Sequence, residues 1–251
     1  LASVTKPVAV ATSIMILVEQ GKLRLWDRVR AYIPEFVPYI KEGGLPGEEA
    51  RLFHLLTHMS GLPPYTDPKE VTAKYGDPCS TEDLVKHIAG LRKELPPGQE
   101  FVYSCLNYIT LARIVKLVSG ENLADFCQKN IFTPLKMKDT MFNPPVELRP
   151  RCVPTEMING QPLRGVVHDP LARLQGGISG NAGLFSTADD LAIFAQMMIN
   201  KGEFKGVRIL SPLAVERMTE IFPLLSSSGR GFGWDLNTDY STVRGDLFGY
   251  K

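Results

Sequence analysis

The first six residues, Leu1-Ala2-Ser3-Val4-Thr5-Lys6, open a stretch with no charged side chain from Pro7 to Val18. Ser3 and Lys6 are three residues apart, so on a helix their hydroxyl and amine lie one turn apart and can meet. The uncharged run predicts a helix that is buried on nearly every side, and Gly21 predicts its end. A lysine at the mouth of such a core is poorly hydrated and gives up its proton more readily, so Lys6 is a candidate base for Ser3.

An isolated Ser-x-x-Lys pair is more often a helix cap beside a solvated charge, so its meaning depends on the rest of the chain. The chain has 251 residues, of which 44% are hydrophobic and 22% charged, as in an ordinary globular domain. The net charge of +1 gives no basic surface for a nucleic acid partner. No apolar run reaches the ~18 to 20 residues needed to span a bilayer, so no membrane span is expected in this chain.

Four cysteines, Cys79, Cys105, Cys127 and Cys152, show neither the spacing of a zinc site nor that of a disulfide framework. Such unpatterned cysteines favour a reducing, cytoplasmic compartment. A signal sequence preceding this chain would instead place the protein in the periplasm. The chain starts without Met, which we interpret as processing or as a fragment of a longer polypeptide.

Local patterns predict a series of short elements between loops rich in Gly and Pro. Ser80 with Asp83, and Thr187 with Asp190, form capping-box signatures at two helix starts. A long connection with little regular structure is expected over 142–170. Helices are expected over 84–91, 106–118, 123–131, 191–198 and 212–219, and short strands over 207–210 and 231–236.

Two other patterns are of a kind found in ligand sites. His54 and His58 are four residues apart on a short predicted helix, but a metal site would need a third ligand. We expect one of these histidines to be exposed and the other to form a hydrogen bond inside; a metal hydrolase stays open as an alternative. The glycines between 176 and 183 lack the Gly-Lys-Ser/Thr ending of a phosphate loop. No cofactor is predicted.

Five segments together resemble the serine β-lactamase and penicillin-binding-protein family, most closely the branch of class C-like enzymes and their esterase relatives. They follow the family order and extend over nearly the whole chain. The segments are A-S-V-T-K-P at 2–7, G-K-L-R-L-W-D-R-V at 21–29, H-L-L-T-H-M-S-G-L-P at 54–63, P-P-G-Q-E-F-V-Y-S at 96–104 and G-N-A-G-L-F-S-T-A-D-D-L-A at 180–192.

The resemblance implies roles for five residues. Ser3 would be the acylated nucleophile and Lys6 its base, while Tyr103 would relay a proton to or from Ser3 and the leaving group. Cys105 occupies the position where the family has the Asn of its Tyr-x-Asn motif, and a thiol is a weaker donor and acceptor than an amide. Cys105 and His168 are the candidate substrate-binding residues. The replacement favours ester over amide chemistry.

The family's third motif, Lys-Thr-Gly or His-Thr-Gly, does not occur in this sequence. In the family this strand supplies an oxyanion-hole N–H, and its loss costs on the order of a hundredfold or more in rate. We therefore expect an α+β, β-lactamase/transpeptidase-like fold whose helix-rich portion is present and most of whose central antiparallel sheet is missing. Missing chain or a partner would supply the strands, and the first helix would expose a large apolar face.

The domain prediction is a single, incomplete β-lactamase-like domain over 1–251. Residues 1–25 and 171–251 would form the sheet-covering α/β part, and 26–170 a mainly helical part. The predicted function is a serine hydrolase that acts through an acyl-enzyme on Ser3, of esterase, D-Ala-D-Ala carboxypeptidase-like or β-lactamase-related type. Its substrate would be a small-molecule ester, peptide or β-lactam. The alternative is a non-catalytic, truncated or degenerate homologue that acts as a binding or assembly module.

Overall fold

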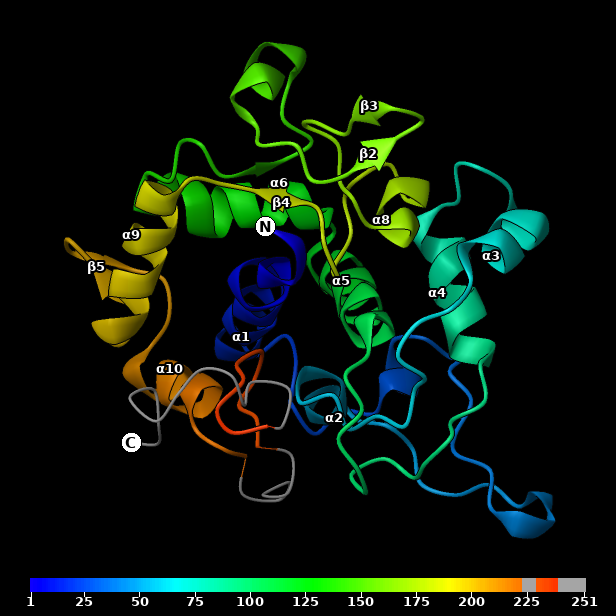
Figure 1. The fold of residues 1–251 in the computed structure, drawn as a ribbon. Coiled ribbons are helices and arrows are strands. Elements are labelled where there is room, and N and C mark those ends of the chain that lie inside the picture. The colour runs from blue at the N-terminus through cyan, green and yellow to red at the C-terminus, as the bar shows by residue number, and fades with distance from the viewer. Residues whose placement is uncertain (223–228, 239–251) are drawn as a thin grey trace.

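The first helical segment lies at the centre of the fold (Figure 1). The structure, a computed structural model, describes residues 1–222 and 229–238. The segment begins with a 3-10 turn at Ala2–Val4, continues as a π-helical turn at Lys6–Ala11, and becomes α1 at Thr12–Glu19. Its side chains from Val8 to Leu17 are buried, which confirms the prediction of a core helix. The expectation of a large exposed apolar face along it is wrong, because helices of this same chain cover it.

Helix α5, Cys105–Ser119, is the main partner of that central segment. It packs against α1 and the π-helical turn on one side and against α2, Leu52–Leu56, and α4, Thr81–Gly90, elsewhere. The helix ends at Gly120, whose φ of +78° is a left-handed conformation that glycine adopts without steric cost. These helices share one large hydrophobic core, so the position of α5 against the start of the chain is fixed by apolar packing.

The remaining helices surround this centre. Both predicted capping residues are confirmed, since Ser80 Oγ accepts from the Asp83 N–H and Thr187 Oγ1 from the Asp190 N–H. Helix 123–131 is divided into α6 and a π-helical turn at Gln128–Phe132. The other bounds are α3 Pro68–Tyr75, α6 Leu123–Cys127, α7 Thr133–Leu135, α8 Pro170–Leu174, α9 Ala188–Ile199 and α10 Pro212–Thr219, with 3-10 turns at Val29–Ala31, Glu42–Gly44 and Val146–Arg151.

Within residues 1–222 and 229–238 the strands form three two-stranded antiparallel ribbons and no larger sheet. They pair β1 Met141–Phe142 with β4 Leu184–Phe185, β2 Met157–Ile158 with β3 Gln161–Pro162, and β5 Glu203–Phe204 with β6 Val207–Arg208. The strand expected over 207–210 is confirmed as the shorter β6. The missing central sheet, and the division of the chain at residues 25 and 170, stay predictions.

The strand predicted over 231–236 is wrong. This stretch turns back on itself, with a bridge between Arg230 and Asp235. The physical reason lies at Gly233, whose φ of +91° interrupts an extended path. A Cβ at this position would lie 2.7 Å from the Ala11 Cβ, so the turn packs closely on the central segment.

The central apolar segment has the length of a membrane-spanning helix. Contrary to the sequence expectation, Ala2–Glu19 is long and apolar enough to cross a membrane by length and composition, but 67% of it is buried inside the fold. It is therefore accounted for as a core helix.

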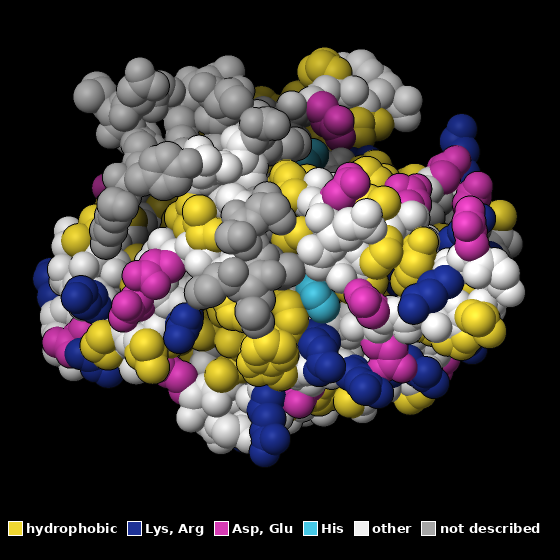
Figure 2. All heavy atoms as spheres, turned by 90° about the horizontal axis from the view of Figure 1, so that it is seen from below, with side chains coloured by type: hydrophobic (Ala, Val, Ile, Leu, Met, Phe, Trp, Pro, Cys, Tyr) yellow, Lys and Arg dark blue, Asp and Glu magenta, His cyan; other side chains and the backbone are white. Residues whose placement is uncertain are grey.

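On the face seen from below, Lys and Arg side chains lie among Asp and Glu side chains (Figure 2), in keeping with the net charge of +1.

Candidate active site

Ser3 and Lys6 form the pair that their spacing predicts. Ser3 lies in the exposed 3-10 turn, and Lys6 begins the π-helical turn that follows it. The Lys6 Nζ donates to Ser3 Oγ at 2.8 Å. Because the Lys6 side chain is only 2% exposed, its amine meets Ser3 from the protein interior while the hydroxyl faces solvent. A serine nucleophile and a lysine base would need a contact of this kind.

Two further contacts fix the Lys6 amine. Nζ donates to the Asn181 carbonyl at 2.9 Å and lies 3.7 Å from Cys105 Sγ. A carbonyl accepts hydrogen bonds and cannot donate them, so Asn181 always holds one N–H of Lys6. Lys6 Nζ is thus held by the Asn181 carbonyl and the Cys105 sulfur while it contacts Ser3 Oγ. The three contacts are therefore compatible with a base.

Asn181 was not among the predicted site residues. Its contribution is a backbone carbonyl, which any residue type supplies, so no side-chain pattern could identify it. The segment around it is fixed against the start of the chain, since the Leu184 N–H donates to Thr5 Oγ1 at 3.1 Å and the Leu1 nitrogen to the Leu184 carbonyl at 2.8 Å. Strand β4 thereby holds the acceptor in place beside Lys6.

Tyr103 and Cys105 reach the same place from the start of α5. The Tyr103 ring centroid is 5.1 Å from Lys6 Nζ, within the range of a cation–π contact. The structure thus brings together Ser3, Lys6, Tyr103 and Cys105, although the chemical roles given to them stay predictions. Arg230, missed by sequence reasoning, places its guanidinium 5.7 Å from the Tyr103 ring and pairs with Asp235 at 3.3 Å.

His54 in α2 and His58 just after its end are both buried, so the expectation that one of them would be exposed is wrong. His54 Nδ1 accepts the Arg51 N–H at 2.9 Å, and burial followed by the charge of Arg51 lowers the pKa of His54 to about 4. His58 Nδ1 accepts the Ser104 N–H at 3.1 Å. Over the described part of the chain, no group of three His, Cys, Asp or Glu side chains could hold a metal ion.

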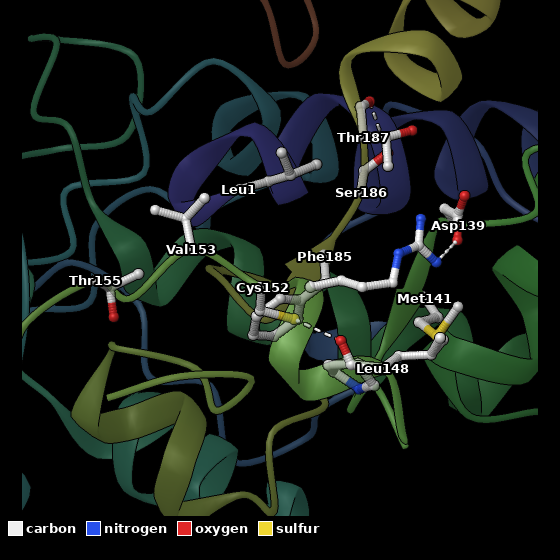
Figure 3. A pocket seen from close by; sticks show the side chains of 12 residues that line it. Leu1, Asp139, Met141, Leu148, Cys152, Val153, Thr155, Phe185, Ser186 and Thr187 are labelled. Carbon is white, nitrogen blue, oxygen red and sulfur yellow. Dashed lines mark hydrogen bonds and ion pairs between the residues drawn. The ribbon is translucent and has the colours of Figure 1, made fainter. Parts of the chain in front are cut away.

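His168 lies close to the start of the chain, which carries Ser3. It lines a pocket of about 340 Å³ with Ala2 and Gly183 among its walls. A neighbouring pocket of about 280 Å³ (Figure 3) is lined by Leu1, Phe185 and Arg151, the last paired with Asp139 at 2.6 Å. Neither pocket has Ser3, Lys6 or Tyr103 in its lining. The role of His168 as a substrate contact stays a prediction.

Comparisons with known proteins show the family of the chain. The family model described as Beta-lactamase matches residues 1–251. The N-acetylmuramyl-L-alanine amidase of Bacillus subtilis (strain 168) is 30% identical, over 94% of this chain and 57% of that protein. The "Putative D-alanyl-D-alanine carboxypeptidase" of Escherichia coli (strain K12) is 29% identical, over 94% and 58%. The chain thus spans less than two thirds of the length of these curated relatives.

Solved structures share the fold. The octameric penicillin-binding protein homologue from Pyrococcus abyssi is 26% identical with a TM-score of 0.67, and the match covers 92% of this chain and 52% of that one. EstCE1, described as a hydrolase with promiscuous acyltransferase activity, is 23% identical with a TM-score of 0.69, covering 93% and 67%. These likenesses confirm the expected β-lactamase/transpeptidase-like fold.

Proposed function

Since this chain belongs to the beta-lactamase family, we propose that it is a serine hydrolase that forms an acyl-enzyme on Ser3. The observation that carries the proposal is the 2.8 Å contact between Lys6 Nζ and Ser3 Oγ, made by an amine that is almost wholly withdrawn from water. A lysine that is only a solvated surface charge would not be buried in this way.

The proposed reaction proceeds in two steps. Ser3 Oγ attacks the substrate carbonyl carbon while its proton passes to the neutral Lys6 amine. The tetrahedral adduct collapses, the bond to the leaving group breaks, and the Tyr103 hydroxyl relays a proton to that group. Water then attacks the Ser3 ester, which releases the acid and restores the hydroxyl. Contacts to the Asn181 carbonyl and Cys105 keep Lys6 in place through both steps.

We infer small esters and peptidoglycan-type D-amino-acid peptides as the substrate classes, with β-lactams ranked below them. The curated relatives are named as an N-acetylmuramyl-L-alanine amidase and a "Putative D-alanyl-D-alanine carboxypeptidase", which supports chemistry at acyl groups of cell-wall peptides. Cys105 favours esters, because its sulfur is a weak hydrogen-bond partner for a substrate amide.

The first test is intact-mass spectrometry of the purified protein after incubation with a fluorophosphonate. We expect a single adduct that is absent from Ser3→Ala, because only an activated serine hydroxyl reacts with this probe. A penicillin applied to a parallel sample should form its own adduct if penicillin-binding chemistry is present. Absence of any adduct on folded protein would refute the hydrolase and leave the non-catalytic homologue.

A further inference from the structure

Tyr103 is held on both of its flanks by one residue, His58. The Val102 N–H donates to the His58 carbonyl at 3.0 Å, and the Ser104 N–H donates to His58 Nδ1 at 3.1 Å. The backbone on each side of Tyr103 is thus bound to the same residue. His58 precedes Ser104 by 46 positions in the chain. His58 can present both its carbonyl and its ring to this segment because its φ is +59°, an uncommon conformation for a residue with a side chain.

The two rings also stack. The His58 and Tyr103 ring centroids are 4.4 Å apart with an interplanar angle of 28°. Tyr103 in turn has Lys6 Nζ 5.1 Å from its ring centroid. Stacking restricts the tilt of the Tyr103 ring, and the two hydrogen bonds restrict the position of its backbone. His58 therefore limits how the Tyr103 ring can move relative to Lys6.

A buried polar network holds His58 itself in one orientation. Asn107 Nδ2 lies 3.3 Å from His58 Nδ1, and Asn107 Oδ1 accepts from the Ser60 hydroxyl at 2.5 Å. Because Nδ1 accepts the Ser104 N–H, the ring proton is on Nε2, which has no hydrogen-bond partner among residues 1–222 and 229–238.

The ring also stays neutral. Burial, followed by the charges of Arg230 and Lys6, lowers the pKa of His58 well below its ordinary value, against the opposing effect of the Ser104 backbone contact. The other groups that face the ring are Phe101, Tyr103 and Tyr108. In the charged form a proton on Nδ1 would point at the Ser104 N–H, and this hydrogen bond would be lost. The neutral form of the ring therefore preserves it.

We propose that His58 is the positioning residue of Tyr103: it holds the tyrosine ring beside Lys6 through one stacking contact and two backbone hydrogen bonds. The proposal rests on the hydrolase function given above. His58 does not reach Ser3 or Lys6 through any hydrogen bond of the described residues, so it acts through the tyrosine.

His54 offers a matched control. It is also buried, also accepts a backbone N–H through Nδ1, and also packs on an aromatic ring, that of Phe53 at 4.2 Å. Its backbone hydrogen bond is made with Arg51 and its ring contact with Phe53. Substituting either histidine therefore removes a buried ring and an acceptor of a backbone N–H, and we expect only the change at His58 to alter the tyrosine.

The experiment compares His58→Asn and His58→Phe with His54→Asn and His54→Phe, using turnover of a p-nitrophenyl ester and thermal unfolding. Asn keeps an acceptor for the Ser104 N–H without a ring, and Phe keeps a ring without the acceptor. We expect kcat of His58→Asn to fall on the order of tenfold to a hundredfold, since small misplacements of catalytic groups have effects of this size. KM should change little, and the His54 variants should keep wild-type kcat.

A double-mutant cycle decides whether the loss passes through the tyrosine. In a Tyr103→Phe background, His58→Asn should cause no further loss of kcat, because the hydroxyl that it positions is already gone. Full additivity of the two losses, or equal losses in the His54 and His58 variants, would overturn the positioning role.

A second readout does not depend on turnover. With ¹³C-labelled tyrosine rings, the Tyr103 resonance is identified by its absence from Tyr103→Phe. It should shift or broaden in His58→Asn and stay in place in His54→Asn. An unchanged resonance refutes the inference even if wild-type protein hydrolyses the ester, whereas a shifted resonance in a protein that no fluorophosphonate labels would refute only the hydrolase.

Discussion

At Lys6, acceptors from separate parts of the chain meet one amine. Ser3 is local, Cys105 is 99 positions away and Asn181 is 175 positions away. The contact to sulfur is the weakest, because a thiol is a poor acceptor and the distance is 3.7 Å. Cys105 is therefore the position at which a side-chain change can alter the reaction without removing the Ser3–Lys6 pair.

We expect Cys105→Asn to raise the ratio of amide to ester turnover about tenfold, because an amide side chain can hydrogen-bond both the substrate amide and Lys6, and one such bond contributes roughly 1.5 kcal/mol. The measurement is kcat/KM for a p-nitrophenyl ester and the matching p-nitroanilide. Cys105→Ala is the control, since it removes the sulfur and adds no hydrogen-bonding group. An equal rise in both variants would show that steric relief, and not hydrogen bonding, sets the preference.

Among the elements, α5 and the 180–184 segment are in close contact behind the site. Gly180 lies against the backbone of α5, where an added Cβ would be 1.9 Å from the Tyr108 carbonyl oxygen and 2.8 Å from the Ala112 Cβ. Backbone atoms cannot rotate away as a flexible side chain can. Glycine at this position therefore lets the 180–184 segment approach α5 closely enough for the Asn181 carbonyl to reach Lys6.

Gly180→Ala should lower the free energy of unfolding by on the order of 1–3 kcal/mol, as for other overpacked positions, and should reduce ester turnover by moving Asn181. Urea denaturation and initial rates test the two effects. Gly90→Ala is the matched control, because Gly90 has open space at its Cβ position and lacks a left-handed φ. A Gly180 variant as stable and active as the Gly90 variant would show that the segment does not set the site.

For the whole molecule, Lys93 links stability to pH. Its side chain is 2% exposed, its Nζ donates to the Ala89 and Leu91 carbonyls, and it lies 4.0 Å from the Phe36 ring centroid. Burial lowers the pKa of Lys93 to about 7 from an ordinary 10.5. Between these two values the unfolded chain binds the extra proton, so the free energy of unfolding should rise as pH increases from 7 toward 10.

Lys93→Met should flatten that rise, which denaturant titrations at pH 7, 8 and 9 would measure. The exposed Lys86 of α4 provides the control, since Lys86→Met should leave the slope unchanged. A wild-type slope that survives in Lys93→Met would mean that other groups cause it.

The sequence by itself determined the local part of this protein. A three-residue spacing was enough to place Ser3 against Lys6, because both residues belong to one turn of one helical segment. Ser80 and Thr187 cap their helices as predicted for the same reason, and the uncharged run after Lys6 predicted the buried central helix. The five family segments predicted the fold that the solved relatives share.

Only the tertiary structure decided what surrounds that pair. Asn181 contributes a backbone carbonyl and His58 a left-handed conformation, and neither has a signature in the pattern of residue types. His58 is buried against the rings of Tyr103 and Tyr108, and the turn at Gly233, found in place of a strand, packs on the central segment. Contacts between residues far apart in the chain form only when the hydrophobic core brings their elements together, so local spacing cannot specify them.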